Sequence, residues 1–179
     1  GKTYIIDGKE VKGYYTDDNG SLQWEFDVPT AGFYYINLDY IIPSKSGSSN
    51  NGSNAERALY VNDQLLFDAL GSLNFYRVYR DNATAIEFYL KNGELPVDLK
   101  GNNLKPSQEE IPNVRRQEFL QDDKGYVQDP YLVYFNAGVN TLKIESIREE
   151  LIFLFVKLQI TQLKHMKTML RNMKLMVLN

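Results

Sequence analysis

The chain has 179 residues, 43% of them hydrophobic and 24% charged, which is enough for one domain with a sizeable buried core. It contains no cysteine and one histidine, so disulfides, thiolate chemistry and most imidazole-based acid–base or metal chemistry are excluded. A formal charge of −3 argues against a nucleic-acid-binding protein, no apolar run approaches the roughly 20 residues of a membrane span, and the composition favours a binding or structural module over an enzyme.

Apolar and polar residues alternate with a period of two in the first half of the chain, which predicts β-strands. The apolar side chains share one face in residues 22–28 and again in residues 34–42. Trp24 lies on the apolar face of the first strand, so we expect it to pack in the core. Pro43 ends the second strand because proline cannot donate to a sheet ladder. The Ser-, Gly- and Asn-rich residues 44–54 predict an exposed loop.

Further strands are predicted at residues 73–79, 131–135, 142–145 and 151–160. In the last of these, one face is expected to carry Ile152, Leu154, Val156, Leu158 and Ile160. Residues 83–90 are ambiguous and compatible with a short helix, and residues 91–130 are expected to be mostly loop. About 40 residues of loop are unusual in a compact domain and point to function or to extra local packing. Short strands separated by turns predict an all-β fold over residues 1–160, a β-sandwich or jelly roll.

The C-terminal segment, residues 161–179, differs in composition from the rest. All four methionines and the histidine lie in it, and no acidic residue follows Glu150. One interpretation is a basic amphipathic helix that meets a membrane or an acidic partner. We favour another, because a shift of reading frame with AT-rich codons converts this segment into an acidic amphipathic sequence with a glycine stop. The segment is therefore predicted to be a frameshifted tail, with no role for His165.

Arg77 falls on the apolar face of a predicted strand, with Leu73 and Phe75. A lone buried charge is too costly, so this guanidinium is expected to have a carboxylate partner. Candidate partners are Glu110, Asp122 and Glu149. A structural ion pair is the favoured use of Arg77, and recognition of an anion or a uronic acid is the alternative.

The polar segment 98–126 is the candidate ligand site. A sugar site needs amide and carboxylate groups for hydroxyls and an aromatic face for the ring C–H groups. We expect Asn102 and Glu110 to take paired hydroxyls and Tyr126 to stack on the sugar. Arg77 and Asp122 are expected to hold an anionic or hydroxyl-rich edge. The alternative is that these residues anchor a long loop through bonds to its backbone.

A calcium ion is the one cofactor that the sequence leaves open. Asp17, Asp18 and the following Asn-Gly have the oxygen density of a calcium loop, and Glu10 is a further candidate ligand. The spacing is not that of an EF-hand, because Val28 occupies the twelfth position. A plain turn is the favoured interpretation of this segment.

Signs of catalysis are few. There is no Gly-x-Ser-x-Gly elbow, phosphate-binding loop or dinucleotide fingerprint, and no histidine lies near the serines of residues 44–53. The adjacent carboxylates of Glu109 and Glu110 are not spaced to flank a glycosidic bond. The sequence therefore predicts a protein that is not an enzyme.

The run Trp24-Glu-Phe-Asp-Val-Pro-Thr-Ala-Gly-Phe-Tyr34 resembles the galactose-binding-like β-sandwich, the fold of many carbohydrate-binding modules. A broader resemblance covers residues 20–160. It is to a module of large secreted solute-binding proteins, the extracellular subunits of sugar-type ABC importers in Gram-positive bacteria. The matching stretches are residues 56–62, 75–81, 101–112, 122–126, 129–130, 138–142 and 146–149. The chain departs from the pattern at Tyr79 and after Pro112, where tryptophan is expected, and at Glu150, where proline is expected.

This resemblance implies a non-catalytic accessory module, extracellular and tethered to the cell surface through its parent protein. Its expected partners are an oligosaccharide or cell-wall glycan and the other domains of the parent protein, with no nucleic acid and no membrane insertion of this domain. The alternatives are a purely structural spacer and a fragment of a carbohydrate-active enzyme. The start at Gly1 without methionine indicates a segment of a longer protein.

Overall fold

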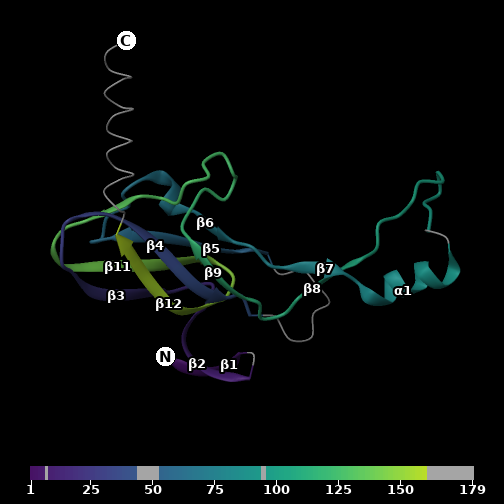
Figure 1. Cartoon of the computed structure of the whole chain (residues 1–179), viewed down its shortest axis with the longest axis horizontal. Helices are drawn as coiled ribbons and strands as arrows, with labels where there is room; N and C mark the ends of the chain where they lie inside the picture. The colour runs from purple at the N-terminus through teal and green to yellow at the C-terminus, as the bar shows by residue number, and fades with distance from the viewer. Residues whose placement is uncertain (7, 44–52, 94–95, 161–179) are drawn as a thin grey trace, which may run out of the picture.

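The computed structural model describes residues 1–6, 8–43, 53–93 and 96–160 (Figure 1). Two antiparallel sheets pack face to face, and a separate two-stranded antiparallel ribbon projects from them. The all-β sandwich predicted from the sequence is confirmed. The predicted frameshifted tail, residues 161–179, lies outside the described residues, as does most of the predicted loop at 44–54.

The first sheet has six strands in the order β1-β2-β12-β4-β10, and β9 also pairs with β4. Its strands are β1 (Lys2–Ile6), β2 (Lys9–Thr16), β4 (Gly32–Ile41), β9 (Arg115–Phe119), β10 (Val133–Phe135) and β12 (Leu151–Ile160). The second sheet has four strands in the order β3-β11-β5-β6. They are β3 (Ser21–Val28), β5 (Ala55–Val61), β6 (Leu73–Phe75) and β11 (Gly138–Arg148).

The main core fills the space between the two sheets. Alternate residues of β4, β5 and β11 point into it, including Ile36, Leu59 and Leu142, each without measurable exposure. Burial of side chains of this size stabilises a fold by about 1.5–3 kcal/mol each. Trp24 of β3 packs edge-on against Phe153, with 5.9 Å between ring centroids. The prediction of a core role for Trp24 is confirmed.

Strand β12 does not keep one face, and the prediction for it was wrong. Its register against β4 shifts between Phe153 and Phe155, where the strand carries a bulge. Before the bulge Phe153 faces the main core and Ile152 the outer side, whereas after it Val156 and Leu158 face the core. One extra residue in a strand exchanges its two faces, which the period-two pattern cannot reveal.

A second, small core lies on the outer side of the first sheet. Ile41, Ile152 and Leu154 form it. Tyr4, Ile6 and Val11 from the β1–β2 hairpin pack against it. The hairpin thus covers the outer face that the β12 bulge makes apolar.

Between β6 and β9 the chain leaves the sandwich and forms an arm, residues 78–111, that extends well away from it (Figure 1). Its root is the antiparallel ribbon of β7 (Tyr79–Asp81) and β8 (Gln108–Glu110). Its helix α1 (Ala83–Asn92) begins where the Asn82 side chain accepts the backbone N–H of Ala85. It ends at Gly93, which has φ +69°. The short helix compatible with residues 83–90 is confirmed.

Residues 91–130 are mostly irregular, as predicted, but β8 and β9 were not predicted. Strand β9 has the sequence Arg-Arg-Gln-Glu-Phe, which shows no apolar alternation. It pairs with β4 at a sheet edge, so its polar side chains are not forced into the core. A 3-10 turn, η1 (Asp68–Gly71), follows β5 on the sandwich. No helix in the described part of the chain is long and apolar enough to cross a membrane.

Candidate functional site

Arg77 follows β6, and its side chain is 1% exposed. Nη1 lies 2.7 Å from a carboxylate oxygen of Glu110, and Nη2 lies 3.2 Å from one of Glu149. Nε also donates to the backbone carbonyl of Ser53 at 2.9 Å. The prediction of a carboxylate partner is confirmed for two of the three candidates. The guanidinium is held from several sides, so Arg77 anchors the root of the arm.

No sugar-sized cleft lies between Arg77 and Glu110. The hollow that these two residues border has a volume of about 10 Å³. That is far below the roughly 300–1,000 Å³ of sites that bind small molecules. The geometry therefore supports the structural ion pair that was favoured from the sequence.

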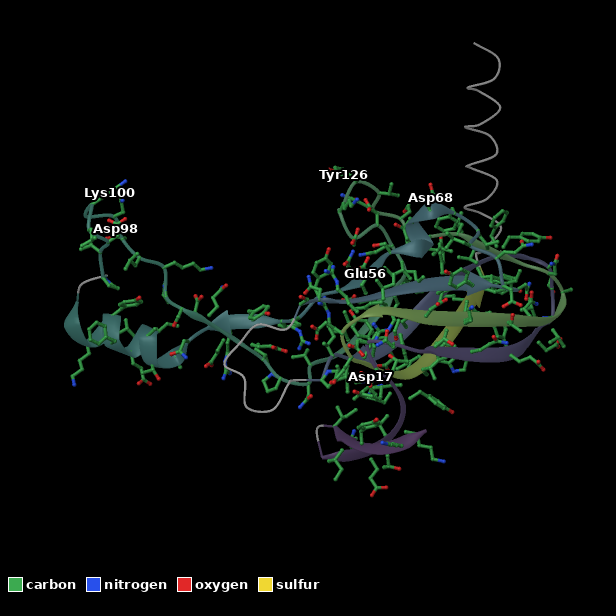
Figure 2. All side chains as sticks on the ribbon, turned by 180° about the vertical axis from the view of Figure 1, so that it is seen from behind. Asp17, Glu56, Asp68, Asp98, Lys100 and Tyr126 are labelled. Carbon is green, nitrogen blue, oxygen red and sulfur yellow. The ribbon has the colours of Figure 1, made fainter. Side chains whose placement is uncertain are left out.

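Asn102 lies at the far end of the arm. Its side-chain amide and its backbone N–H both donate to Asp98, each at 2.9 Å. These bonds, with one from the Lys100 backbone, hold the pKa of Asp98 below its ordinary value. Figure 2 shows Asp98 far from Tyr126. The structure does not bring Asn102 together with the other predicted site residues.

Asp122 organises the loop that carries Tyr126. Its carboxylate accepts the backbone N–H groups of Lys124 at 3.2 Å, Tyr126 at 2.6 Å and Val127 at 3.0 Å. Partial desolvation raises the pKa of Asp122, but these hydrogen bonds outweigh it and hold the pKa below its ordinary value. Tyr126 is 86% exposed at the loop tip (Figure 2). Its ring is accessible, whereas Asp122 is committed to the loop backbone.

The candidate calcium ligands are not grouped. No set of three Asp, Glu, His or Cys side chains able to hold a metal occurs among the described residues. Glu10 pairs with Ile5 in the β1–β2 hairpin. Asp17 accepts the backbone N–H of Asp18 at 2.9 Å in the turn before β3. This geometry fits the plain-turn interpretation.

A hollow of about 610 Å³ opens on the sandwich between β4 and β9 on one side and β6 and η1 on the other. The loop of residues 120–125 forms its rim. We call it the rim hollow. Its aromatic lining residues are Tyr40, Phe75, Tyr76, Phe119 and Tyr131. Its charged or amide lining residues are Asp68, Asn74, Arg116, Glu118, Gln121, Asp122, Asp123 and Lys124.

One wall of the rim hollow is held by Glu118 of β9. One oxygen of Glu118 accepts the Tyr40 hydroxyl at 2.9 Å, and the other lies 2.5 Å from Nη2 of Arg116. Burial and the nearby Glu118 carboxylate raise the pKa of Tyr40. Arg116 also reaches the backbone carbonyl of Tyr76 at 3.4 Å. These contacts join β9 to the end of β6.

The opposite wall is held by Asp123. Its Oδ2 accepts the Asn74 side-chain amide at 2.5 Å and the Tyr76 hydroxyl at 3.3 Å. Partial desolvation, with the nearby Asp123 carboxylate, raises the pKa of Tyr76. Within the described part of the chain, Asp123 Oδ1 has no hydrogen-bond partner. The Tyr76 side chain is 43% exposed, so its ring borders the opening.

Of the residues that line the rim hollow, Asp122 was a candidate from the sequence, whereas Asn74, Tyr76 and Asp123 were not. A signal was present for two of them. Alternation that starts in β6 and continues into the two residues after it buries Leu73, Phe75 and Arg77, and it therefore puts Asn74 and Tyr76 on the other side of the chain. Nothing in the sequence shows that Asp123, 49 residues from Asn74, meets that face.

A second hollow, of about 600 Å³, lies between the edges of the two sheets, beside β3 and the end of β12. Its lining is mainly apolar and includes Trp24, Phe26, Leu158 and Ile160. Glu25, Asp27 and Lys157 also line it, and it resembles an open end of the core.

No protein-family model matches this chain, and no curated protein matches it.

Proposed function

We propose that this chain is a non-catalytic carbohydrate-binding module of an extracellular solute-binding protein, and that its glycan site is the rim hollow. The observation that carries the proposal is the combination at one opening of an accessible tyrosine ring with carboxylate, amide and guanidinium groups. That combination is the chemistry of sugar recognition, because sugars present both apolar C–H faces and paired hydroxyls. The secreted, importer-associated setting comes from the sequence resemblance.

Each group has a definite role in this proposal. The Tyr76 ring takes the C–H face of a sugar ring, and Asp123 Oδ1 accepts a hydroxyl. Asn74 keeps its amide oxygen for a second hydroxyl, because its nitrogen is used by Asp123. The bond from Asn74 and the bond from Tyr76 hold Asp123 in place before a ligand arrives. Such preorganisation lowers the entropic cost of binding.

The carboxylates of the hollow support binding rather than hydrolysis. A glycosidase needs a carboxylic acid whose pKa is raised, so that it can protonate the leaving group. The pKa of Asp122 is lowered, and Glu118 is tied to a cation and a phenol. Glycosidase assays on the full chain test the enzyme-fragment alternative, which expects release of reducing sugar.

The second candidate function is a structural spacer that docks against other domains of the parent protein. The observation that favours it is the arm, which carries exposed apolar side chains on and after α1, among them Phe88, Leu90 and Leu99. An apolar patch of this kind marks an interaction surface. A spacer needs no glycan, so titration separates the two functions.

The test is calorimetric titration of the full chain with cellotetraose, β-1,4-galactotetraose, N-acetylchitotetraose and xylotetraose. Tyr76→Ala should weaken binding by about 1–3 kcal/mol, the size of a lost aromatic contact. The matched control is Tyr134→Ala on β10, where the tyrosine is 46% exposed and lines neither hollow. If Tyr76→Ala leaves the affinity unchanged, the glycan site is not the rim hollow. If none of the oligosaccharides binds, the carbohydrate-binding function is contradicted and the structural spacer is the remaining candidate.

A further inference from the structure

The charges around the rim hollow are unbalanced. Among the described residues, four carboxylates and two cations border it, and the cations are Arg116 and Lys124. Arg116 is paired with Glu118 at 2.5 Å, so its charge is neutralised within the protein. Lys124 lies exposed on the rim loop, where an ammonium keeps its water. Among the described lining residues, negative charge therefore exceeds positive charge at the opening.

Two of the carboxylates face a ligand without a cation of their own. Asp68 at the start of η1 has no ion pair within the described part of the chain, and it lies on the same side of the sandwich as Tyr126 (Figure 2). Asp123 is bonded only to the neutral groups of Asn74 and Tyr76. Neither carboxylate has a cation partner among the described residues.

The cation expected to recognise an acidic sugar is not available. Arg77 is bound to Glu110 and Glu149 and is 1% exposed. A sugar carboxylate in the rim hollow would lose water and would lie near Asp68 and Asp123. The guanidinium that lines the hollow among the described residues, that of Arg116, is already paired with Glu118. The loss of hydration without a new partner and the repulsion between like charges both weaken binding of an acidic sugar.

We propose that the rim hollow selects neutral sugars and rejects uronic acids. This inference rests on the proposed function and names the sugar class that the site takes. Hydroxyls satisfy Asp123 Oδ1 and the Asn74 amide oxygen, because both are hydrogen-bond acceptors and a hydroxyl is a donor. A carboxylate offers no donor to either of them.

The experiment compares each tetrasaccharide of the titration panel with its own derivative in which the C6 hydroxymethyl groups are oxidised to carboxylates. Xylotetraose has no C6 and serves as a neutral reference. In low salt, the oxidised form of a bound tetrasaccharide should bind roughly tenfold more weakly than the parent. At 0.5 M NaCl the ratio of the dissociation constants of the oxidised sugar and its parent should fall, because salt screens charges at a solvent-exposed site.

Asp68→Asn is the diagnostic variant, since it removes one charge with little change of shape. It should narrow the ratio between the affinities for the parent and the oxidised sugar, because removing a like charge raises the affinity for the oxidised form. The matched control is Glu87→Gln on α1, the same loss of one charge on the arm. It should leave the ratio of the two affinities unchanged, because α1 lies away from β6 and β9, whose residues line the rim hollow (Figure 1).

The outcomes separate the two proposals. An oxidised sugar that binds as tightly as its parent, or a ratio that Asp68→Asn does not change, overturns the charge selection while the glycan site stands. A panel in which no parent tetrasaccharide binds overturns the proposed function, and this inference with it. A ratio that narrows equally in Glu87→Gln contradicts selection at the rim hollow.

Discussion

The Arg77 guanidinium lies 2.7 Å from the Glu110 carboxylate, and this pair joins the two chain segments at the root of the arm. The same guanidinium reaches Glu149, which has φ +60° in the turn between β11 and β12. One buried cation thus ties the arm to the sandwich. A second, Arg57, holds the same turn by donating to the backbone carbonyls of Arg148 and Glu149.

Replacement of Arg77 by methionine should lower the free energy of unfolding by about 3–5 kcal/mol. The reason is that Glu110 and Glu149 would stay largely buried without their cation. Urea unfolding followed by circular dichroism measures the change. The control is Arg80→Met, whose pair with Glu109 is equally short but whose side chain is 62% exposed. Exposed pairs contribute about 0–1 kcal/mol, so equal effects of the two variants would contradict the anchor role.

Arg57→Lys should also destabilise the fold, by roughly 2–4 kcal/mol, although the charge is kept. The two terminal nitrogens of Arg57 serve the Thr16 hydroxyl and three backbone carbonyls, and a single ammonium cannot reach them all. Burial lowers the pKa of Arg57 to about 10, so it is charged at pH 7. Thermal unfolding at pH 7 tests this. Arg148→Lys is the control, and a loss as large there would show that any arginine of this turn is equally sensitive.

The rim loop should loosen only in strong acid. Backbone N–H donors hold the pKa of Asp122 below the ordinary value of about 3.9. Its stabilisation is therefore complete above the unfolded-state pKa and is lost as pH falls through the lower folded-state value. Carboxyl carbon NMR of Asp122 should show an inflection below 3.9, and hydrogen exchange of the Val127 amide should speed up in the same range. Asp122→Asn should abolish that inflection and leave the one from Asp98, and an inflection at or above 3.9 would contradict the prediction.

Gly13→Ala should disturb the packing of the β1–β2 hairpin against Ile152 of β12. A Cβ at Gly13 would lie 2.8 Å from Ile152 Cγ2 and 3.0 Å from the Tyr4 ring. Overpacking of this kind costs about 1–3 kcal/mol, measured as a lower urea midpoint. Gly32→Ala is the control, since no atom lies within 4 Å of its added Cβ. Equal urea midpoints for the two variants would show that the hairpin accommodates the added methyl group without loss of stability.

The encoding DNA should contain one inserted or deleted base near the codon of Ile160. Restoring the frame should replace the basic, methionine-rich residues 161–179 with an acidic sequence. Sequencing the gene and closely related genes tests this. A frame shared intact by those genes across the region would contradict the frameshift.

The strands β3, β4 and β12 and the buried state of Arg77 could be predicted because they follow from the alternation of neighbouring residues. Strands β1, β2, β8 and β9 were not predicted. Period two shows which side chains share a face, and elementary electrostatics then requires carboxylates beside a buried guanidinium. Glu110 and Glu149 were found in this way although they lie 33 and 72 residues from Arg77. The arm helix was compatible with its sequence for similar local reasons.

Alternation does not show which strand lies next to which, or where a strand changes face. The β12 bulge, the pairing of the polar strand β9 with β4, and the rim hollow all depend on contacts between distant segments. Asn74, Tyr76 and Asp123 come together because β6 ends opposite the rim loop, and no local pattern encodes that. The sequence by itself thus determined the all-β fold and the need for a carboxylate beside Arg77, with three candidates for it. Only the tertiary structure decided which carboxylates pair with Arg77 and where the rim hollow lies, because both depend on how distant segments are placed in space and not on the periodicity within one segment.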